Sequence, residues 1–160
     1  MWEAQKCLRQ EEADFRDNPV QDLHAEPVSN DLLRWQASMS GPKGGPYEGG
    51  VFHLRINLSF DYPNVEPRVT FETKIYHPAV LPCGTVCPLC LARSLGNPVY
   101  NLKAVLQTVL RLLDNPHSCE IHLFHGVGNL HRTDPQLFAA IAKECTRRHA
   151  WEEMNQRAGG

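Results

Sequence analysis

The sequence predicts an α+β fold in which an antiparallel sheet packs against helices. Three observations lead to this class. Residues 51–60 alternate between apolar and polar side chains, which is the period of a strand with one buried face. Residues 102–113 carry apolar side chains at helical spacing. A second helix begins near Thr133-Asp134-Pro135, where a capping residue precedes a proline of the first turn.

The first half of the chain supplies one helix and the predicted strands. A helix over 2–16 ends at Asn18-Pro19, and a strand follows at 32–38. Residues 41–50 contain seven Gly or Pro and predict a turn. A short strand is expected at 68–71, with Val69 and Phe71 inward. In the strand over 51–60 the inward side chains are expected to be Phe52, Leu54, Ile56, Leu58 and Phe60.

The second half begins with an aperiodic segment over 75–100, which predicts a long ordered loop of the kind that often carries function. The buried helix over 102–113 stops at Asn115-Pro116. The inner face of the last helix is predicted to hold Leu137, Phe138, Ile141, Ala142 and Cys145. We expect a single domain over residues 1–160, with its core at about 4–151 and a flexible tail at 152–160.

The composition excludes several classes of protein. The formal net charge is −2 and the basic residues are scattered, whereas a nucleic-acid-binding protein needs a basic face. No apolar run approaches the roughly 18 residues of a membrane span. The opening segment lacks the layout of a secretory signal. We therefore expect the chain in the cytoplasm, the nucleus or both.

The expected loop contains three cysteines, Cys83, Cys87 and Cys90, at the spacing C-x3-C-x2-C. Three interpretations are open. The thiolates could hold an iron–sulfur cluster, or a zinc ion together with His77, although zinc sites usually present paired C-x2-C units. All three cysteines could fill space in a loop. A single one could act as a nucleophile toward an activated acyl group, which requires no neighbouring base.

Several motifs, in order over residues 4–151, resemble those of the ubiquitin-conjugating enzymes. The family cysteine lies ten residues after the motif His77, and this count reaches Cys87, preceded by Gly84-Thr85-Val86. The matching motifs are Trp35, Gly41-Pro42, Pro46-Tyr47-Glu48-Gly49-Gly50, Asp61-Tyr62-Pro63, Pro67-Arg68-Val69-Thr70-Phe71 and Thr73-Lys74-Ile75-Tyr76-His77-Pro78.

The resemblance implies a four-stranded antiparallel meander packed against helices. It also implies a transferase that accepts ubiquitin, or a ubiquitin-like protein, from an activating enzyme as a thioester on Cys87. The modifier would pass to a lysine or to a ligase's own cysteine, and the implied ligase partner is of RING or HECT type. No cofactor or metal is implied, because ATP and magnesium act one step earlier in the pathway.

The sequence departs from the family around the chemistry. Ala79 stands where the family has an asparagine that is thought to steady the oxyanion, so we expect slow transfer to lysine. His77 and Pro78 would order the loop. The nearest match to the acidic residue that aligns the incoming lysine is Glu120. Pro88, directly after the cysteine, should hold Cys87 outside the helical region.

The family's contacts with partners are also altered. Lys6 and Arg9 are the basic residues that the first helix offers to an activating enzyme. Asn64 and Pro98 lie at the two loops that contact ligases, and Asn64 replaces an aromatic residue, which weakens the usual apolar contact. The rival function is a ubiquitin-binding scaffold with weak or no catalysis. A disulfide between Cys87 and Cys83 or Cys90 is a further possibility under oxidation.

Overall fold

The structure is a computed structural model that describes residues 2–96, 99–116, 130 and 132–158. Side chains are described over 3–92, 95–96, 99–116, 130 and 132–151. No helix in the described part of the chain is long and apolar enough to cross a bilayer.

Four antiparallel strands form one sheet in the order β1-β2-β3-β4. They are β1 (Leu23–Val28), β2 (Asp31–Ser40), β3 (Val51–Asn57) and β4 (Arg68–Phe71). Each strand pairs with the next along the chain, which places Trp35 opposite Ile56 and Leu54 opposite Phe71. These four side chains are buried. The predicted four-stranded antiparallel meander is therefore confirmed.

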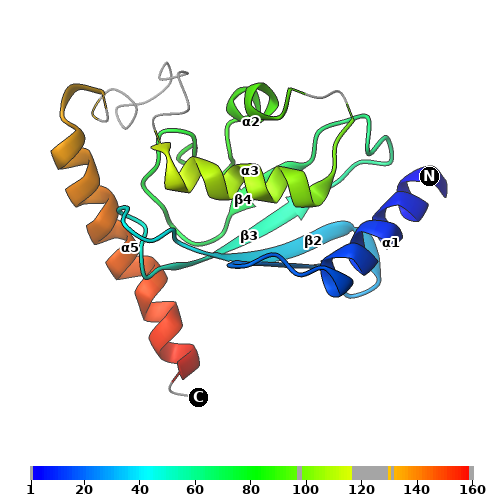
Figure 1. Cartoon of the computed structure of the whole chain (residues 1–160), viewed down its shortest axis with the longest axis horizontal. Coiled ribbons are helices and arrows are strands. Elements are labelled where there is room, and N and C mark those ends of the chain that lie inside the picture. The colour runs from blue at the N-terminus through cyan, green and yellow to red at the C-terminus, as the bar shows by residue number, and fades with distance from the viewer. Residues whose placement is uncertain (1, 97–98, 117–129, 131, 159–160) are drawn as a thin grey trace.

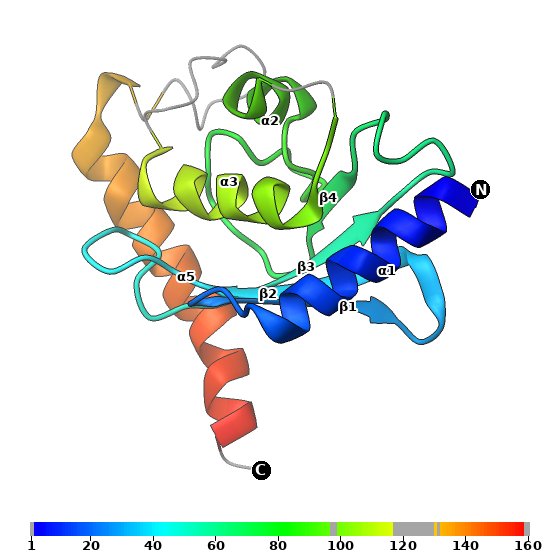
Figure 2. The same ribbon diagram turned by 45° about the vertical axis from the view of Figure 1, so that its right-hand side comes forward.

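Four described helices surround the sheet (Figure 1). They are α1 (Trp2–Asp17), α2 (Pro88–Leu95), α3 (Leu102–Asp114) and α5 (Pro135–Ala158). Helix α3 lies over the sheet with α2 above it, while α1 and α5 lie toward opposite ends. The second view shows the same arrangement, with the C-terminal half of α5 extending past the sheet (Figure 2). The main core lies between the inner face of the sheet and α3.

Two expectations about the strands were wrong. The third strand ends at Asn57, after which the Leu58 N–H bonds the Leu33 carbonyl and the chain turns, so Phe60 is 57% exposed instead of inward. The strand β1 was not predicted. It contains Pro27, which lacks an N–H and is tolerated because β1 lies at the edge of the sheet.

The predicted start of the last helix is confirmed, because the Asp134 carboxylate accepts a hydrogen bond from the Leu137 N–H at 3.1 Å. Its predicted inner face is partly wrong. Leu137 and Ile141 are exposed, and the buried stripe is Phe138, Ala142, Thr146 and Ala150. Helix α5 continues to Ala158, through most of the segment expected as a tail.

The small side chains of this stripe allow α5 to approach two glycines closely. A Cβ on Gly49 would lie 2.5 Å from the Trp151 ring, and a Cβ on Gly50 would lie 2.6 Å from Thr146 Cγ2. The glycine pair of the β2–β3 turn is therefore required by packing against α5. Periodicity alone could not reveal this contact, because it joins segments far apart in the sequence.

One buried carboxylate, that of Glu11 in α1, connects three parts of the fold. The Tyr62 hydroxyl donates to both of its oxygens, at 2.9 and 2.7 Å. The Leu102 N–H, at the first residue of α3, donates to Oε1 at 2.8 Å. This N–H has no partner within its own helix. Glu11 therefore links α1 to the β3–β4 loop and to the start of α3.

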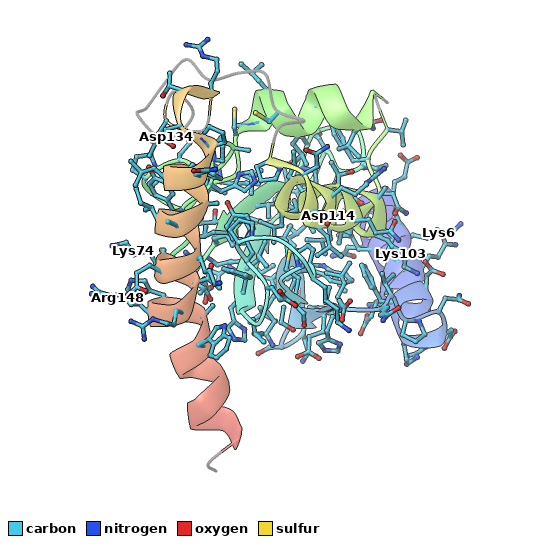
Figure 3. All side chains as sticks on the ribbon, turned by 60° about the vertical axis from the view of Figure 1, so that its left-hand side comes forward. Lys6, Lys74, Lys103, Asp114, Asp134 and Arg148 are labelled. Atoms are coloured by element: carbon cyan, nitrogen blue, oxygen red, sulfur yellow. The ribbon has the colours of Figure 1, made fainter. Side chains whose placement is uncertain are left out.

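A second contact between α1 and α3 lies nearer the surface. The Lys103 ammonium is 2.6 Å from the Asp14 carboxylate, which lowers the pKa of Asp14. The same ammonium lies 5.3 Å from the centre of the Phe15 ring, which in turn packs on Trp35. Figure 3 shows Lys6 and Lys103 on the α1 side of the molecule, and Lys74 and Arg148 on the α5 side.

Replacing Glu11 with alanine should destabilise the fold, because the Tyr62 hydroxyl and the Leu102 N–H lose their buried acceptor. We expect a loss of about 1–3 kcal/mol for each group left without a partner. Urea unfolding measures the change. Glu12→Ala, on the same helix with a less buried side chain, is the control, and equal losses for both variants would contradict the role given to Glu11.

Burial raises the pKa of Glu11 in the folded protein, although Tyr62 and Leu102 oppose the shift. A raised folded pKa means that the contribution of Glu11 to stability is present below its unfolded pKa. That contribution is lost as pH rises through the folded pKa. Glu11→Gln, which cannot ionise, should therefore gain stability relative to the wild type as pH rises from about 4 to 7. Urea unfolding at several pH values tests this, and parallel stability curves would count against it.

Candidate active site

Residues 79–87 form a hairpin, within the segment over 75–100 that was expected to be an aperiodic loop. Across the hairpin the Leu81 N–H bonds the Thr85 carbonyl at 2.9 Å, and the Gly84 N–H closes the turn to the Leu81 carbonyl at 2.8 Å. The second arm pairs with the outer edge of β4. There Val86 N–H bonds the Val69 carbonyl at 2.9 Å, and Phe71 N–H bonds the Gly84 carbonyl at 2.8 Å. The hairpin is thus an extension of the sheet.

Cys87 stands where this hairpin ends and α2 begins. Its N–H bonds the Ala79 carbonyl at 2.7 Å, and its carbonyl accepts the Leu91 N–H at 3.1 Å. Its backbone angles, φ −56° and ψ 117°, are not helical, as the following Pro88 predicted. The residue is 8% exposed. Cys87 is therefore held from both sides by backbone hydrogen bonds.

Helix α2 itself was missed, since residues 88–95 were expected to be loop. Two signals could have revealed it. Pro88 occupies the first turn, where proline needs no N–H partner, and Gly96 ends the helix in the left-handed conformation, φ +60°. Eight residues are too few for a clear apolar period, so only the terminal residues mark the helix.

His77 is buried and hydrogen-bonded through both ring nitrogens. Its Nδ1 accepts the Ala79 N–H at 2.9 Å, and its Nε2 lies 2.7 Å from the Leu112 carbonyl. Because a backbone N–H can only donate, Nδ1 carries no proton and Nε2 donates. The Leu112 carbonyl is one of the last four of α3, which lack helical partners. The neutral ring therefore connects α3 to the start of the hairpin.

The two most distinctive motifs of the sequence meet beside His77. The Tyr47 hydroxyl donates to the Tyr76 carbonyl at 2.7 Å, and the Tyr47 ring lies 5.6 Å from the His77 ring. On the other side, Tyr76 packs on Phe138 of α5. The β2–β3 turn therefore supports the segment that leads into the hairpin, which explains why both motifs occur in one chain.

The backbone N–H and carbonyl of Ala79 are both hydrogen-bonded, and its methyl group is buried. Its N–H bonds His77, its carbonyl accepts the Cys87 N–H, and it is 1% exposed. An asparagine here would add an amide to a buried site, next to the backbone that carries the nucleophile. The alanine offers no side-chain donor to an oxyanion.

The structure describes four of the other predicted residues. Lys6 and Arg9 are exposed on α1. Asn64 is exposed in the β3–β4 loop, where its N–H bonds the Asp61 carbonyl at 2.9 Å. Glu120 and Pro98 lie outside the described residues. Pro78 is buried beside His77.

The β3–β4 loop and the segment before α3 carry exposed apolar side chains that the sequence did not predict. Phe60 and Val65 of the β3–β4 loop are 57% and 44% exposed, and Val99, before α3, is 53% exposed. The Tyr100 N–H bonds the Pro63 carbonyl at 2.8 Å and holds the two loops together. Apolar surface is therefore present although Asn64 is polar.

The cysteines near the site differ from one another. Cys83 is exposed at the hairpin turn, and a hydrogen bond with the Thr85 hydroxyl lowers its pKa. Cys90 is buried and disulfide-bonded, whereas Cys83 and Cys87 are free. Both nitrogens of His77 are already bonded to the protein. The four-ligand metal set of His77 and three thiolates is thus not formed, and the described residues contain no group of three or more His, Cys, Asp or Glu placed to hold a metal ion.

Comparison with known proteins identifies the family. Residues 7–146 match the family model of ubiquitin-conjugating enzymes. The chain belongs to this family. A solved structure, the E2 domain of a ubiquitin conjugating enzyme from Toxoplasma gondii, is similar with a TM-score of 0.76 and 30% sequence identity. The match covers 91% of this chain and 98% of that one. The ubiquitin-conjugating fold expected from the motifs is confirmed.

The hairpin should depend on Gly84. A Cβ there would lie 2.5 Å from the Phe71 carbonyl oxygen, and its φ of +94° disfavours any side chain. Gly44→Ala is a matched control, because Gly44 has φ +86° but nothing within 4 Å of its added Cβ. We expect Gly84→Ala to lose at least about 1 kcal/mol more than Gly44→Ala in urea unfolding. Equal losses would mean that the close approach to β4 is not required.

Proposed function

We propose that this chain accepts ubiquitin, or a ubiquitin-like protein, from an activating enzyme as a thioester on Cys87. The Cys87 thiolate attacks the carbonyl carbon of the activating enzyme's thioester. A new sulfur–carbon bond forms, the old one breaks, and the activating enzyme's cysteine leaves as a thiolate. The observation that carries the proposal is the position of Cys87, pinned by Ala79 at the junction of the hairpin and α2.

No side-chain base is needed for this step, because the acyl group arrives already activated. The described surroundings fit that requirement. His77, the nearest motif residue that could act as a base, has both nitrogens occupied by backbone groups. In this proposal the described residues contribute to catalysis by positioning the backbone of Cys87, and they provide no proton relay.

Family membership implies three partners: ubiquitin, an activating enzyme and a ligase. We assign the activating enzyme to the exposed side of α1 with Lys6 and Arg9. We assign a RING- or HECT-type ligase to the joined loops, where Phe60, Val65 and Val99 supply the apolar contact that Asn64 does not. Ala79 restricts which acceptor can take the modifier after loading, because it offers no side-chain donor to the oxyanion. Transfer to a ligase cysteine is favoured, since it places less demand on oxyanion stabilisation than attack by an amine.

One observation favours a second candidate, a ubiquitin-binding scaffold of the same fold. The buried methyl group of Ala79 occupies the position of the family's oxyanion residue. A chain that no longer performs transfer would tolerate this change. The presence of Cys87 on an intact hairpin supports the enzyme instead, and loading distinguishes the two functions.

Loading is tested by mixing the chain with activating enzyme, ubiquitin and Mg-ATP, and running a non-reducing gel. We expect a band heavier by one ubiquitin that thiol reductant removes. In Cys87→Ser the band should be absent or resist reductant, because an oxygen ester replaces the thioester. Cys83→Ser should load as the wild type does. No band with ubiquitin or with a panel of ubiquitin-like proteins would favour the scaffold.

Discharge of the loaded chain onto free lysine should be roughly 10²–10³-fold slower than for a family member that has asparagine in place of Ala79. Ala79→Asn should raise the rate in a single-turnover assay. Ala79→Leu is the control, since leucine has the same branching and the same number of side-chain heavy atoms as asparagine but has no amide. An equal increase in both variants would assign the effect to packing, and discharge of the wild type at the ordinary rate would refute the role of Ala79.

A further inference from the structure

Helix α5 carries three large apolar side chains that are exposed to solvent. Leu137, Ile141 and Trp151 are 47%, 37% and 44% exposed. Single apolar residues are normal on a protein surface, but these three lie on one line along the helix. That line, the α5 stripe, consists of Leu137, Ile141, Glu144, Arg148 and Trp151, at intervals of four, three, four and three residues. This is the heptad spacing of helices that pair along their length.

The α5 stripe lies on the side of the helix opposite to the one that packs on the domain. The packed side is formed by the buried residues Phe138, Ala142, Thr146 and Ala150. The two rows are about half a helical turn apart. Figure 3 shows Arg148 on the side of α5 that faces away from the sheet. A partner can therefore bind the stripe while α5 stays packed on the domain.

The two charged residues in the middle of the stripe are paired within the helix. The Arg148 Nε donates to Glu144 Oε1 at 3.1 Å, and Arg147 donates to both Glu144 oxygens, at 3.0 and 2.7 Å. Hydrogen bonds from Arg147 and Arg148 lower the pKa of Glu144 to about 2, so its charge is present at neutral pH. A guanidinium has five N–H donors in a planar fork. Arg148 can therefore keep its bond to Glu144 and also reach the carboxylate of a second molecule.

The order of side chains along the stripe fits a second copy of the same chain in antiparallel orientation. In a two-fold contact, each residue and its counterpart meet reciprocally. With the axis at the level of residue 146, Arg148 of each copy faces Glu144 of the other, and Ile141 of each copy faces Trp151 of the other. The same level is the middle of α5 (Pro135–Ala158), so the two helices overlap along their length.

Other arrangements of the two helices bring like charges together. A parallel pair would set Glu144 against Glu144 and Arg148 against Arg148. An antiparallel pair with its axis at the level of either charged residue would set that residue against itself. Like charges that face each other across an interface oppose association. Among these arrangements, the antiparallel register centred on residue 146 is the one that joins opposite charges and apolar side chains together.

We propose that two copies of this chain associate through the α5 stripe, as an antiparallel pair of helices about a two-fold axis at the level of residue 146. One helix face per copy is a small interface, and small interfaces are weak. The dimer therefore forms at high concentration and dissociates on dilution. The contact does not involve Cys87, so it is independent of loading.

Sedimentation velocity of the full chain, from micromolar to millimolar concentration, tests for the dimer. The mass should rise from that of the monomer, 18.1 kDa, toward twice that value. Arg148→Glu and Glu144→Arg should each weaken association at least about 10-fold, because each variant faces a like charge across the axis. Lys143→Glu is the matched control, since it makes the same charge change as Arg148→Glu at an exposed position of α5 outside the stripe. It should associate as the wild type does.

Mixing the two charge variants tests the register. Arg148→Glu has acidic residues at both 144 and 148, and Glu144→Arg has basic residues at both. In a heterodimer of the two, every pair of charges across the axis is opposite, so the mixture should recover the association that each variant lost. This recovery also shows that both variants are folded. If either variant fails to fold, Ile141→Ser takes its place and should weaken association by removing the contact with Trp151.

Four results would overturn the proposal. The first is a wild-type chain that stays monomeric over the whole range of concentration. The second is an equal loss of association in Lys143→Glu and Arg148→Glu, which would mean that the net charge of α5 decides the outcome. The third is a mixture of folded charge variants that stays monomeric, and the fourth is unchanged association in Ile141→Ser.

Discussion

The rest of the site depends on two hydrogen bonds that the neutral imidazole of His77 makes. Its Nε2 donates to the Leu112 carbonyl of α3, and its Nδ1 accepts the Ala79 N–H at the start of the hairpin. Both bonds require one tautomer, since a second proton on the ring would abolish the acceptor. Ala79 in turn receives the Cys87 N–H. The backbone position of Cys87 is thus set by a short chain of hydrogen bonds that begins on α3.

This chain of bonds rests on supports from distant parts of the sequence. Tyr47 holds the Tyr76 carbonyl, α5 packs against the glycines that follow Tyr47, and β4 pairs with the second arm of the hairpin. Glu11 adds a separate connection among α1, the β3–β4 loop and α3. These contacts hold the hairpin against the sheet, and the proposed function uses this position to present Cys87 to a partner's thioester.

Cys87 is 8% exposed and is followed directly by the exposed Pro88 and Leu89. An activated acyl group needs only a positioned sulfur, so the absence of a side-chain base among the described neighbours is compatible with loading. In the proposed function, Ala79 limits the transfer step after loading, because its methyl group offers no hydrogen-bond donor to an oxyanion.

The sequence by itself determined the fold class and the central strands. Strict alternation over 51–57 and the helical spacing over 102–113 are local patterns that follow from the geometry of a single strand or helix. The ten-residue step from His77 points to Cys87 only through the resemblance to the family. Only the tertiary structure decided that Phe60 turns outward, that residues 79–87 form a hairpin on β4, and that α5 buries Thr146 and Ala150 instead of Leu137 and Ile141. The reason is physical: these outcomes depend on hydrogen bonds and close packing between segments far apart in the chain. A periodic pattern reports only which side of one segment prefers to be buried.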